Sequence, residues 1–128
     1  MLVLDTHIAA WLVRTPAELR EAEVRAIRSD ALAVSVISIW ELRIKWNLFA
    51  PSGERKGPAD PAEVLEGLRI FGAEILPLSA EQVVCALDVR PPHKDPFDEL
   101  LLAVCQQLGA RLLTRDAKLR GHPLAFVP

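Results

Sequence analysis

The chain has 128 residues, of which 51% are hydrophobic and 25% are charged. This length suits one domain spanning residues 1–128 with a single sizeable core, and the composition excludes a disordered chain. No apolar run approaches the ~18 to 20 residues that a membrane span needs. The net charge of −2 does not by itself point to nucleic acid, yet with four carboxylates set aside as metal ligands, 13 acids remain against 15 Lys and Arg.

Strands and helices are predicted to alternate along the chain. Strands are predicted over residues 1–4, 32–35, 74–76, 111–114 and 124–127. Helices are predicted over residues 6–13, 17–28, 36–48, 61–71, 80–89 and 96–108. This alternation implies an α/β fold with a mainly parallel sheet covered by helices on both faces, and the wholly apolar segment 1–4 suits a central strand. Residues 51–58, rich in Pro and Gly, predict a surface loop.

Three helix starts carry capping signals. The segments 15–18, 60–63 and 79–82 each begin with Thr, Asp or Ser and have Glu or Gln three residues later. In the first two, proline occupies the first helical position. These signals predict where helices begin and carry no functional information.

The two cysteines, Cys85 and Cys105, lie in segments predicted to be helical and have apolar neighbours. We expect both to be reduced and to serve packing. The sequence has no CxxC pair, which argues against a structural zinc site. Because residues 1–4 read as a buried strand, there is no room for a signal peptide, and we expect a cytoplasmic protein.

Four acidic residues are predicted at one edge of the sheet. Asp5 ends the first strand, Asp116 follows the strand 111–114, and Glu41 and Asp98 lie in helices that start at that same edge. Carboxylates that gather there would repel one another, and a divalent cation removes the conflict. Hard oxygen ligands favour Mg²⁺ or Mn²⁺, which could activate water against a phosphodiester.

Helix capping is the competing explanation for several of these acids. Asp5 is equally well placed as a cap of the helix that follows it, and Asp116 could cap the turn 117–119. For Asp95 capping is the preferred role, with a supporting or ligand role at the site as the alternative.

Glu41 is the acid that capping explains least well. At 100° per residue, Ser38, Glu41 and Lys45 form a polar stripe between two apolar faces of the helix from residue 36 to 49. A carboxylate in that position is predicted to be partly buried and to need a partner, either Lys45 or a metal. Two apolar faces on one helix also suggest that one packs on the sheet and the other on a second chain.

Four segments resemble the motifs of the PIN-domain family, specifically the VapC-type toxins of toxin–antitoxin pairs. They are residues 2–7 (LVLDTH), 34–45 (VSVISIWELRIK), 92–103 (PHKDPFDELLLA) and 112–116 (LLTRD). Their order and spacing agree with the family across essentially the whole chain. Each motif alone is weak, but four in order are specific.

This resemblance implies a three-layer α/β/α fold and an Mg²⁺- or Mn²⁺-dependent endoribonuclease. It also implies that Asp5, Glu41, Asp98 and Asp116 hold the metal, that water attacks the RNA phosphodiester, and that Thr6 and Thr114 hydrogen-bond water or carboxylate. Further expectations are a homodimer and a cognate antitoxin. The chain departs from the family at Glu99, where an arginine is usual, and in a tail after Asp116 that lacks the expected aromatic residue.

Several basic residues lie near the motifs. Arg43, Lys45, Lys94 and Arg115 are candidates for contacts with RNA phosphate, with Lys118 nearby, although each could equally be a solvated surface charge. His7 and His93 flank predicted ligands, but the metal mechanism requires neither and we do not assign a general base.

Two other functions compete with the nuclease. The runner-up is a catalytically silent module that acts by binding a protein partner through its apolar helix faces. A phosphotransfer domain also gathers acids at strand ends, but it would normally have an adjacent acidic pair early in the chain, which Asp5-Thr6-His7 does not supply.

Overall fold

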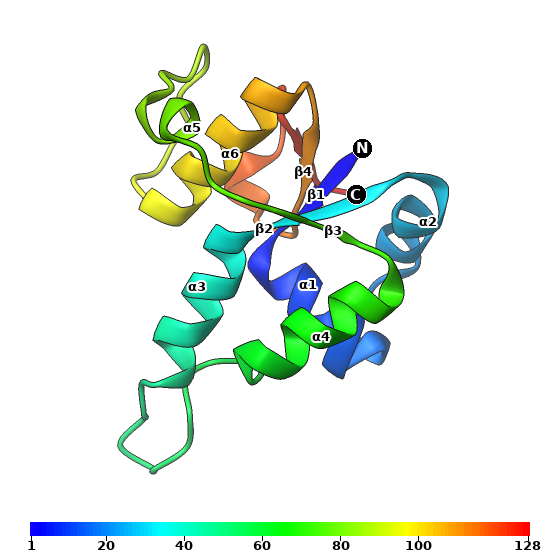
Figure 1. The fold of residues 1–128 in the computed structure, drawn as a ribbon, viewed down its shortest axis with the longest axis vertical. Helices are drawn as coiled ribbons and strands as arrows, with labels where there is room; N and C mark the ends of the chain where they lie inside the picture. Colours follow the sequence, from blue (N-terminus) through cyan, green and yellow to red (C-terminus); the bar gives the residue numbers. More distant parts are fainter.

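The computed structural model describes all residues 1–128. Its centre is a five-stranded sheet in the order β3-β2-β1-β4-β5, with every neighbouring pair parallel (Figure 1). The strands are β1 (Leu2–Leu4), β2 (Leu32–Ser35), β3 (Glu74–Leu76), β4 (Arg111–Leu113) and β5 (Ala125–Phe126). The helices are α1 (Thr6–Arg14), α2 (Glu21–Ser29), α3 (Val36–Trp46), α4 (Pro61–Phe71), α5 (Ala80–Val84) and α6 (Pro96–Leu108). Short 3₁₀ turns cover Pro16–Glu18 and Ala117–Leu119.

The sheet separates two hydrophobic clusters, as the pleat of a strand requires. Leu2 and Leu4 belong to the cluster that includes α1, α2 and α4, whereas Val3 between them belongs to the cluster beneath α6. All three β1 side chains are buried, which is what a central strand covered on both faces needs. The predicted three-layer α/β/α arrangement and the central position of β1 are therefore confirmed.

The strand order places a topological switch point between β1 and β4. From β1 the chain moves outward through β2 to β3, then crosses back to β4 and continues to β5 on the other side. Connections leaving β1 and β4 thus run in opposite directions and open a crevice at their carboxyl ends, which is where open α/β sheets bind ligands. Asp5 follows β1 directly, and Thr114 follows β4 directly.

Two predicted helices differ most from their expected extent. The helix expected over 17–28 is a 3₁₀ turn followed by α2, because Leu19 is extended and the Thr15 side chain caps nothing. The helix expected over 80–89 ends at Val84. There the Gln106 side chain bonds the carbonyl of Ala86 and the amide of Asp88, so a contact from α6 replaces the helical bonds that residues 86–88 would have made. The capping residues Asp60 and Ser79 were correctly predicted.

Helix α3 leaves an apolar face uncovered. Ile37 and Leu42 are buried against the rest of the fold, but Val36, Trp40 and Ile44 are exposed, Trp40 by 52%. The helix ends at Trp46, two residues before its predicted end. Val36, Trp40 and Ile44 thus form an exposed apolar strip beside the buried Ile37.

Both cysteines are free. Cys105 is buried in α6, where burial raises the pKa of its thiol to about 12 and makes it chemically inert. Cys85 is half-buried and follows the last residue of α5, so it does not lie within a helix as expected. No helix of the fold is both long and apolar enough to cross a membrane.

Candidate functional site

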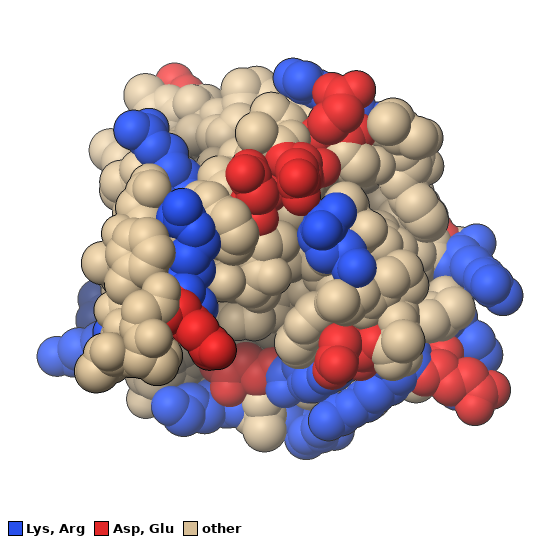
Figure 2. All heavy atoms as spheres, turned by 90° about the horizontal axis from the view of Figure 1, so that it is seen from below, with Lys and Arg blue, Asp and Glu red and all other residues tan.

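The four acids singled out in the sequence line one pocket of about 330 Å³ at the carboxyl edge of the sheet. They come from four segments, namely the end of β1, the second turn of α3, the first turn of α6 and the loop after β4. Figure 2 views the molecule from the end toward which α1 and α3 extend, and acidic side chains gather near the middle of that face with basic ones on either side. The fold therefore brings together residues up to 111 positions apart, Asp5 and Asp116.

Asp5 is held at the floor of this pocket. Its Oδ1 accepts a hydrogen bond from the Thr6 amide at 2.7 Å, and its Oδ2 accepts one from the Thr114 hydroxyl at 2.7 Å. Burial raises the pKa of Asp5 above its ordinary value, against the lowering effect of these two hydrogen bonds, and the charge of Glu41 raises it further. Asp5 is thus both the cap of α1 and a member of the acidic pocket.

Glu41 is buried, with 7% of its surface exposed. Its Oε1 accepts from the Thr6 hydroxyl at 2.7 Å, and its Oε2 forms an ion pair with Lys45 Nζ at 2.5 Å. Thr6 therefore contacts two acids, donating its amide to Asp5 and its hydroxyl to Glu41. Lys45 is the partner that a buried glutamate needs when no metal is bound.

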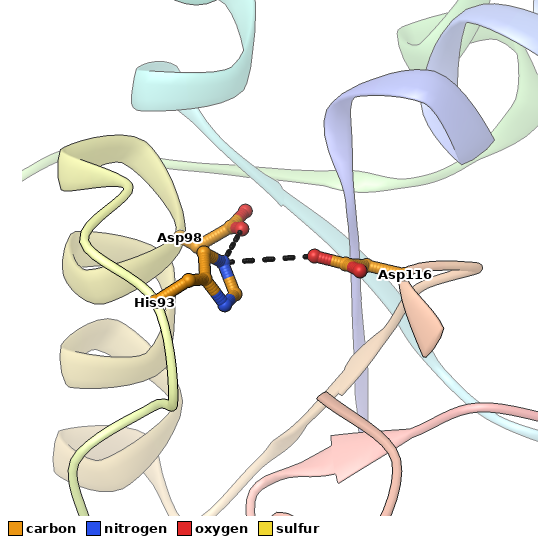
Figure 3. Close-up of side chains that lie close together, drawn as sticks. All are labelled: His93, Asp98 and Asp116. Atoms are coloured by element: carbon orange, nitrogen blue, oxygen red, sulfur yellow. Dashed lines mark hydrogen bonds and ion pairs between the residues drawn. The ribbon is translucent and has the colours of Figure 1, made fainter. Parts of the chain in front are cut away.

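Asp98 shares its surroundings with His93 (Figure 3). Its Oδ2 lies 2.8 Å from His93 Nε2, and its side chain is 14% exposed. Burial raises the pKa of Asp98 to about 6, against the lowering effect of the His93 hydrogen bond and with additional increases from the charges of Asp5 and Asp95. A cation placed beside Asp98 would stabilise its ionised form and lower this raised pKa.

Asp116 and Asp95 both cap the elements that follow them. Asp116 Oδ1 accepts from the Lys118 amide at 2.9 Å, while its Oδ2 lies 3.6 Å from His93 Nε2. Asp95 Oδ1 accepts from the amides of Phe97 at 2.9 Å and Asp98 at 3.3 Å. Capping is therefore shown for Asp95, although its side chain also lines the pocket.

The four basic residues predicted to contact RNA phosphate lie in three different surface pockets. Lys45 and Arg115 line the acidic pocket. Arg43 instead borders an apolar groove between α3 and α4, and Lys94 borders a separate polar groove before α6. Glu99 lies in that second groove and not in the acidic pocket, so its unusual charge is not added to the four carboxylates.

Arg115 already has a structural partner. Its guanidinium binds Glu23 through two hydrogen bonds, of 2.8 and 2.6 Å, and lies 4.1 Å from the centroid of the Trp11 ring. Glu23 is 1% exposed in its side chain, so the pair locks α2 to the loop that carries Asp116. The sequence offered no sign of this pairing, since the two residues are 92 positions apart.

His93 was the other residue whose position the sequence did not reveal. Its Nε2, one oxygen of Asp98 and one oxygen of Asp116 all lie within 4.8 Å of one another. The order His93-Lys94-Asp95-Pro96-Phe97-Asp98 places the histidine in a loop, and a loop conformation does not follow from spacing alone. His7 lines the acidic pocket and is exposed, whereas His93 borders the neighbouring polar groove.

The donor set fits a hard divalent cation. The pocket offers carboxylate oxygens from four acids, two of which have raised pKa values, and it has no sulfur ligand. Mg²⁺ and Mn²⁺ favour such oxygen ligands, and bringing either to the pocket would relieve the repulsion among the acids.

Comparison with known proteins gives a consistent result. The sequence model of the PIN domain matches residues 2–123. Ribonuclease VapC22 of Mycobacterium tuberculosis (strain ATCC 25618 / H37Rv) is 34% identical over 125 residues, which are 94% of this chain and 91% of the relative.

Two solved structures share the fold. One is a toxin-antitoxin complex from Klebsiella pneumoniae, with a TM-score of 0.65 and 20% identity over 100% of this chain and 98% of that one. The other is VapBC2 from Rickettsia felis bound to a DNA fragment from their promoter, with a TM-score of 0.62 and 18% identity over 99% and 96%. At these identities the likeness establishes the fold alone.

Proposed function

Because the chain belongs to the PIN-domain family, we propose that it is a divalent-metal-dependent endoribonuclease and the toxin of a VapBC-type toxin–antitoxin pair. The observation that carries the proposal is the meeting of Asp5, Glu41, Asp98 and Asp116 in one pocket. A relative that is 34% identical and named a ribonuclease supports the choice of RNA over other phosphodiesters.

Asp5, Glu41, Asp98 and Asp116 would hold the cation, which is Mg²⁺ or Mn²⁺. A cation held there would lower the pKa of a water molecule that it binds and would stabilise negative charge on the scissile phosphate. Thr6 and Thr114 keep the carboxylates in position through the hydrogen bonds described above. Asp95 supports the site indirectly, by capping the turn of α6 that carries Asp98.

Lys45 is placed to receive the RNA. It lines the pocket with its side chain 35% exposed, and its ion pair with Glu41 holds the ammonium beside the acids. Arg115 lines the same pocket but is committed to Glu23, and Arg43 and Lys94 lie on neighbouring grooves. Lys45 is therefore the nearest phosphate contact, and Arg43 and Lys94 would act on more distant parts of the strand.

The proposed partners follow from the family and from the exposed surface. A cognate antitoxin binds the protein in the cytoplasm and restrains its nuclease activity. The exposed apolar face of α3, which includes Val36, Trp40 and Ile44, supports a homodimer. Light scattering of the purified chain tests the dimer, and a monomeric mass at micromolar concentration would contradict it.

The nuclease is tested by incubating the purified, partner-free chain with total RNA and Mg²⁺, Mn²⁺ or EDTA. We expect cleavage with metal only, and its loss in Asp5→Asn and Asp98→Asn. Asp88→Asn is the matched control, because Asp88 is exposed and lies outside the pocket. Cleavage that survives EDTA, or that is equal in the two pocket variants, would rule out the proposed chemistry.

The same experiment separates the silent binding module from the enzyme. A silent module would leave RNA intact in every metal while the chain remained folded by circular dichroism. Expression in cells gives an independent readout, since a toxin should arrest growth and Asp5→Asn should relieve the arrest. Growth arrest that persists in Asp5→Asn would favour action through partner binding.

A further inference from the structure

His93 lies outside the acidic set and faces the carboxylates of two of the four acids. Its Nε2 is 2.8 Å from Asp98 Oδ2 and 3.6 Å from Asp116 Oδ2, and the side chain is 17% exposed. Figure 3 shows one ring nitrogen facing both carboxylates, which come from α6 and from the loop after β4. The histidine therefore lies at the junction of two segments of the pocket that have no direct hydrogen bond between them.

The neighbours of Nε2 decide which way its hydrogen bond runs. An ionised carboxylate only accepts, so a nitrogen that faces two carboxylate oxygens must carry the proton. Nε2–H then donates to Asp98 and points close to Asp116. The neutral ring with its proton on Nε2 supplies this donor and carries no N–H on Nδ1.

The other ring nitrogen argues against direct metal ligation. A histidine that binds metal through Nε2 carries its proton on Nδ1 and normally donates that proton to a carboxylate, a carbonyl or water. His93 Nδ1 is buried and has no hydrogen-bond partner. A ring that bound metal through Nε2 would carry its N–H on this buried Nδ1, and a buried N–H without an acceptor costs about 1 to 3 kcal/mol.

The oxygens of Asp98 show what the contact achieves. His93 takes Oδ2, and no hydrogen bond from the protein reaches Oδ1. In Figure 3 the second oxygen of Asp98 is turned away from the imidazole. The hydrogen bond therefore fixes the carboxylate in one orientation and leaves a free oxygen for a cation.

We propose that His93 is a positioning residue of the metal site, which donates Nε2–H to Asp98, faces the carboxylate of Asp116 at 3.6 Å, and orients the Asp98 carboxylate without itself binding the metal. The inference rests on the proposed metal site and adds to it a residue that the four acidic motifs do not contain. Partners of this kind are worth about 10- to 100-fold in metal affinity.

The test measures Mn²⁺ binding to the full chain without RNA, by the electron paramagnetic resonance signal of free Mn²⁺. We expect His93→Ala to weaken Mn²⁺ binding by about 10- to 100-fold. His93→Gln places an amide N–H where Nε2 lies and should bind within a few-fold of the unmodified protein. His93→Asn places its amide where Nδ1 lies and should be as weak as His93→Ala. Arg90→Ala, at an exposed residue of the same loop, is the control for disturbance of the loop and should bind normally.

A spectroscopic measurement separates positioning from ligation. Pulsed electron paramagnetic resonance of bound Mn²⁺ detects a directly coordinated ¹⁴N nucleus. We expect the unmodified protein to show no coordinated-nitrogen signal that is lost in His93→Gln. A coordinated nitrogen lost in His93→Gln would overturn the proposal in favour of a ligand. If His93→Ala binds Mn²⁺ as tightly as the unmodified protein, His93 has no role and the proposal is overturned. If the Gln and Asn variants bind Mn²⁺ equally weakly, the proposal is overturned in favour of packing alone.

These outcomes differ from a failure of the nuclease proposal. If the unmodified protein cleaves RNA with Mn²⁺ and the His93 variants bind Mn²⁺ normally, the positioning role alone is lost. If cleavage survives EDTA, the nuclease proposal fails whatever the variants do. Should His93→Ala not fold, the comparison of His93→Gln with His93→Asn and the ¹⁴N spectrum decide.

Discussion

The hydroxyl of Thr114 donates to Asp5 Oδ2 at 2.7 Å, joining residues 109 positions apart across the switch point of the sheet. The hydroxyl oxygen of Thr114 also accepts a hydrogen bond from the Asp116 amide at 3.1 Å. One buried threonine, with 0% of its surface exposed, thereby sets the position of two acids of the pocket at once.

Replacing Thr114 with valine should weaken both the site and the fold. Valine has nearly the same shape but cannot donate to Asp5, so the buried carboxylate loses a partner. We expect a loss of about 1 to 3 kcal/mol in the free energy of unfolding and roughly tenfold weaker Mn²⁺ binding. Urea unfolding and Mn²⁺ titration measure the two effects. Thr114→Ser keeps the hydroxyl, and a serine variant as damaged as the valine variant would contradict the role of the hydrogen bond.

Removing the charge of Lys45 should have opposite effects on metal and on RNA. Lys45 pairs with Glu41 and competes with any cation for it, so Lys45→Gln should tighten Mn²⁺ binding by several-fold. The same variant should bind RNA less tightly, and its salt dependence should fall by about 0.7 in slope for one lost phosphate contact on a single strand. Fluorescence anisotropy with an oligonucleotide, in the Asp5→Asn background, measures the slope.

Lys118→Gln is the comparison for Lys45→Gln, because Lys118 is exposed and lies outside the pocket. An unchanged slope in Lys45→Gln together with a reduced slope in Lys118→Gln would move the RNA path away from the pocket.

Stability without metal should fall as the pH rises between about 4 and 6. The pKa of Asp98 is about 6 in the folded protein against an ordinary value of 3.8, and that of Asp5 is also raised. The folded state therefore binds protons more tightly than the unfolded chain, and its advantage is lost as these acids ionise. For Asp98 the effect is at most about 3 kcal/mol.

Urea unfolding in EDTA from pH 4 to pH 8 checks this dependence, and Asp98→Asn should flatten it. Excess Mn²⁺ should reverse the trend, since the metal binds only ionised carboxylates. If the free energy of unfolding in EDTA rises steadily from pH 4 to pH 6 in the unmodified protein, ionisation of these acids does not destabilise the metal-free fold.

Loss of the Glu23–Arg115 pair should destabilise the fold. Burial tends to raise the pKa of Glu23, but the hydrogen bonds from Arg115 and from the Arg20 amide outweigh it and leave the pKa below its ordinary value. Glu23→Gln should therefore cost about 2 kcal/mol in the free energy of unfolding near neutral pH. The contribution of ionised Glu23 is present above about pH 4.5 and disappears as the pH falls through its lowered folded pKa.

Thermal and urea unfolding of Glu23→Gln measure this cost, with Glu66→Gln as a control on the exposed surface of α4. If Glu23→Gln is as stable as the control but binds RNA differently, Arg115 is held for the substrate and not for the fold.

Much of the fold could be predicted because its signals are local. The apolar strand at residues 2–4, the cap at Asp60 and the capping box at Ser79 act through neighbours within a few positions, and the structure contains all three. The helix expected to continue to residue 89 failed because Gln106, about 20 positions away, binds the backbone at Ala86 and Asp88. A long-range side-chain contact of that kind leaves no trace in local propensity.

The sequence by itself determined which four acids would meet, because strands of a parallel sheet end at one edge and Asp5, Glu41, Asp98 and Asp116 all follow strands or open helices there. Helical spacing already predicted Lys45 as a partner of Glu41. Only the tertiary structure decided the partners that are distant in sequence or held by loops: Thr114 for Asp5, Thr6 for Glu41, and His93 for Asp98. Periodicity fixes the face of a helix on which a residue lies, whereas hydrogen-bond partners depend on how loops and helices pack within a few ångströms.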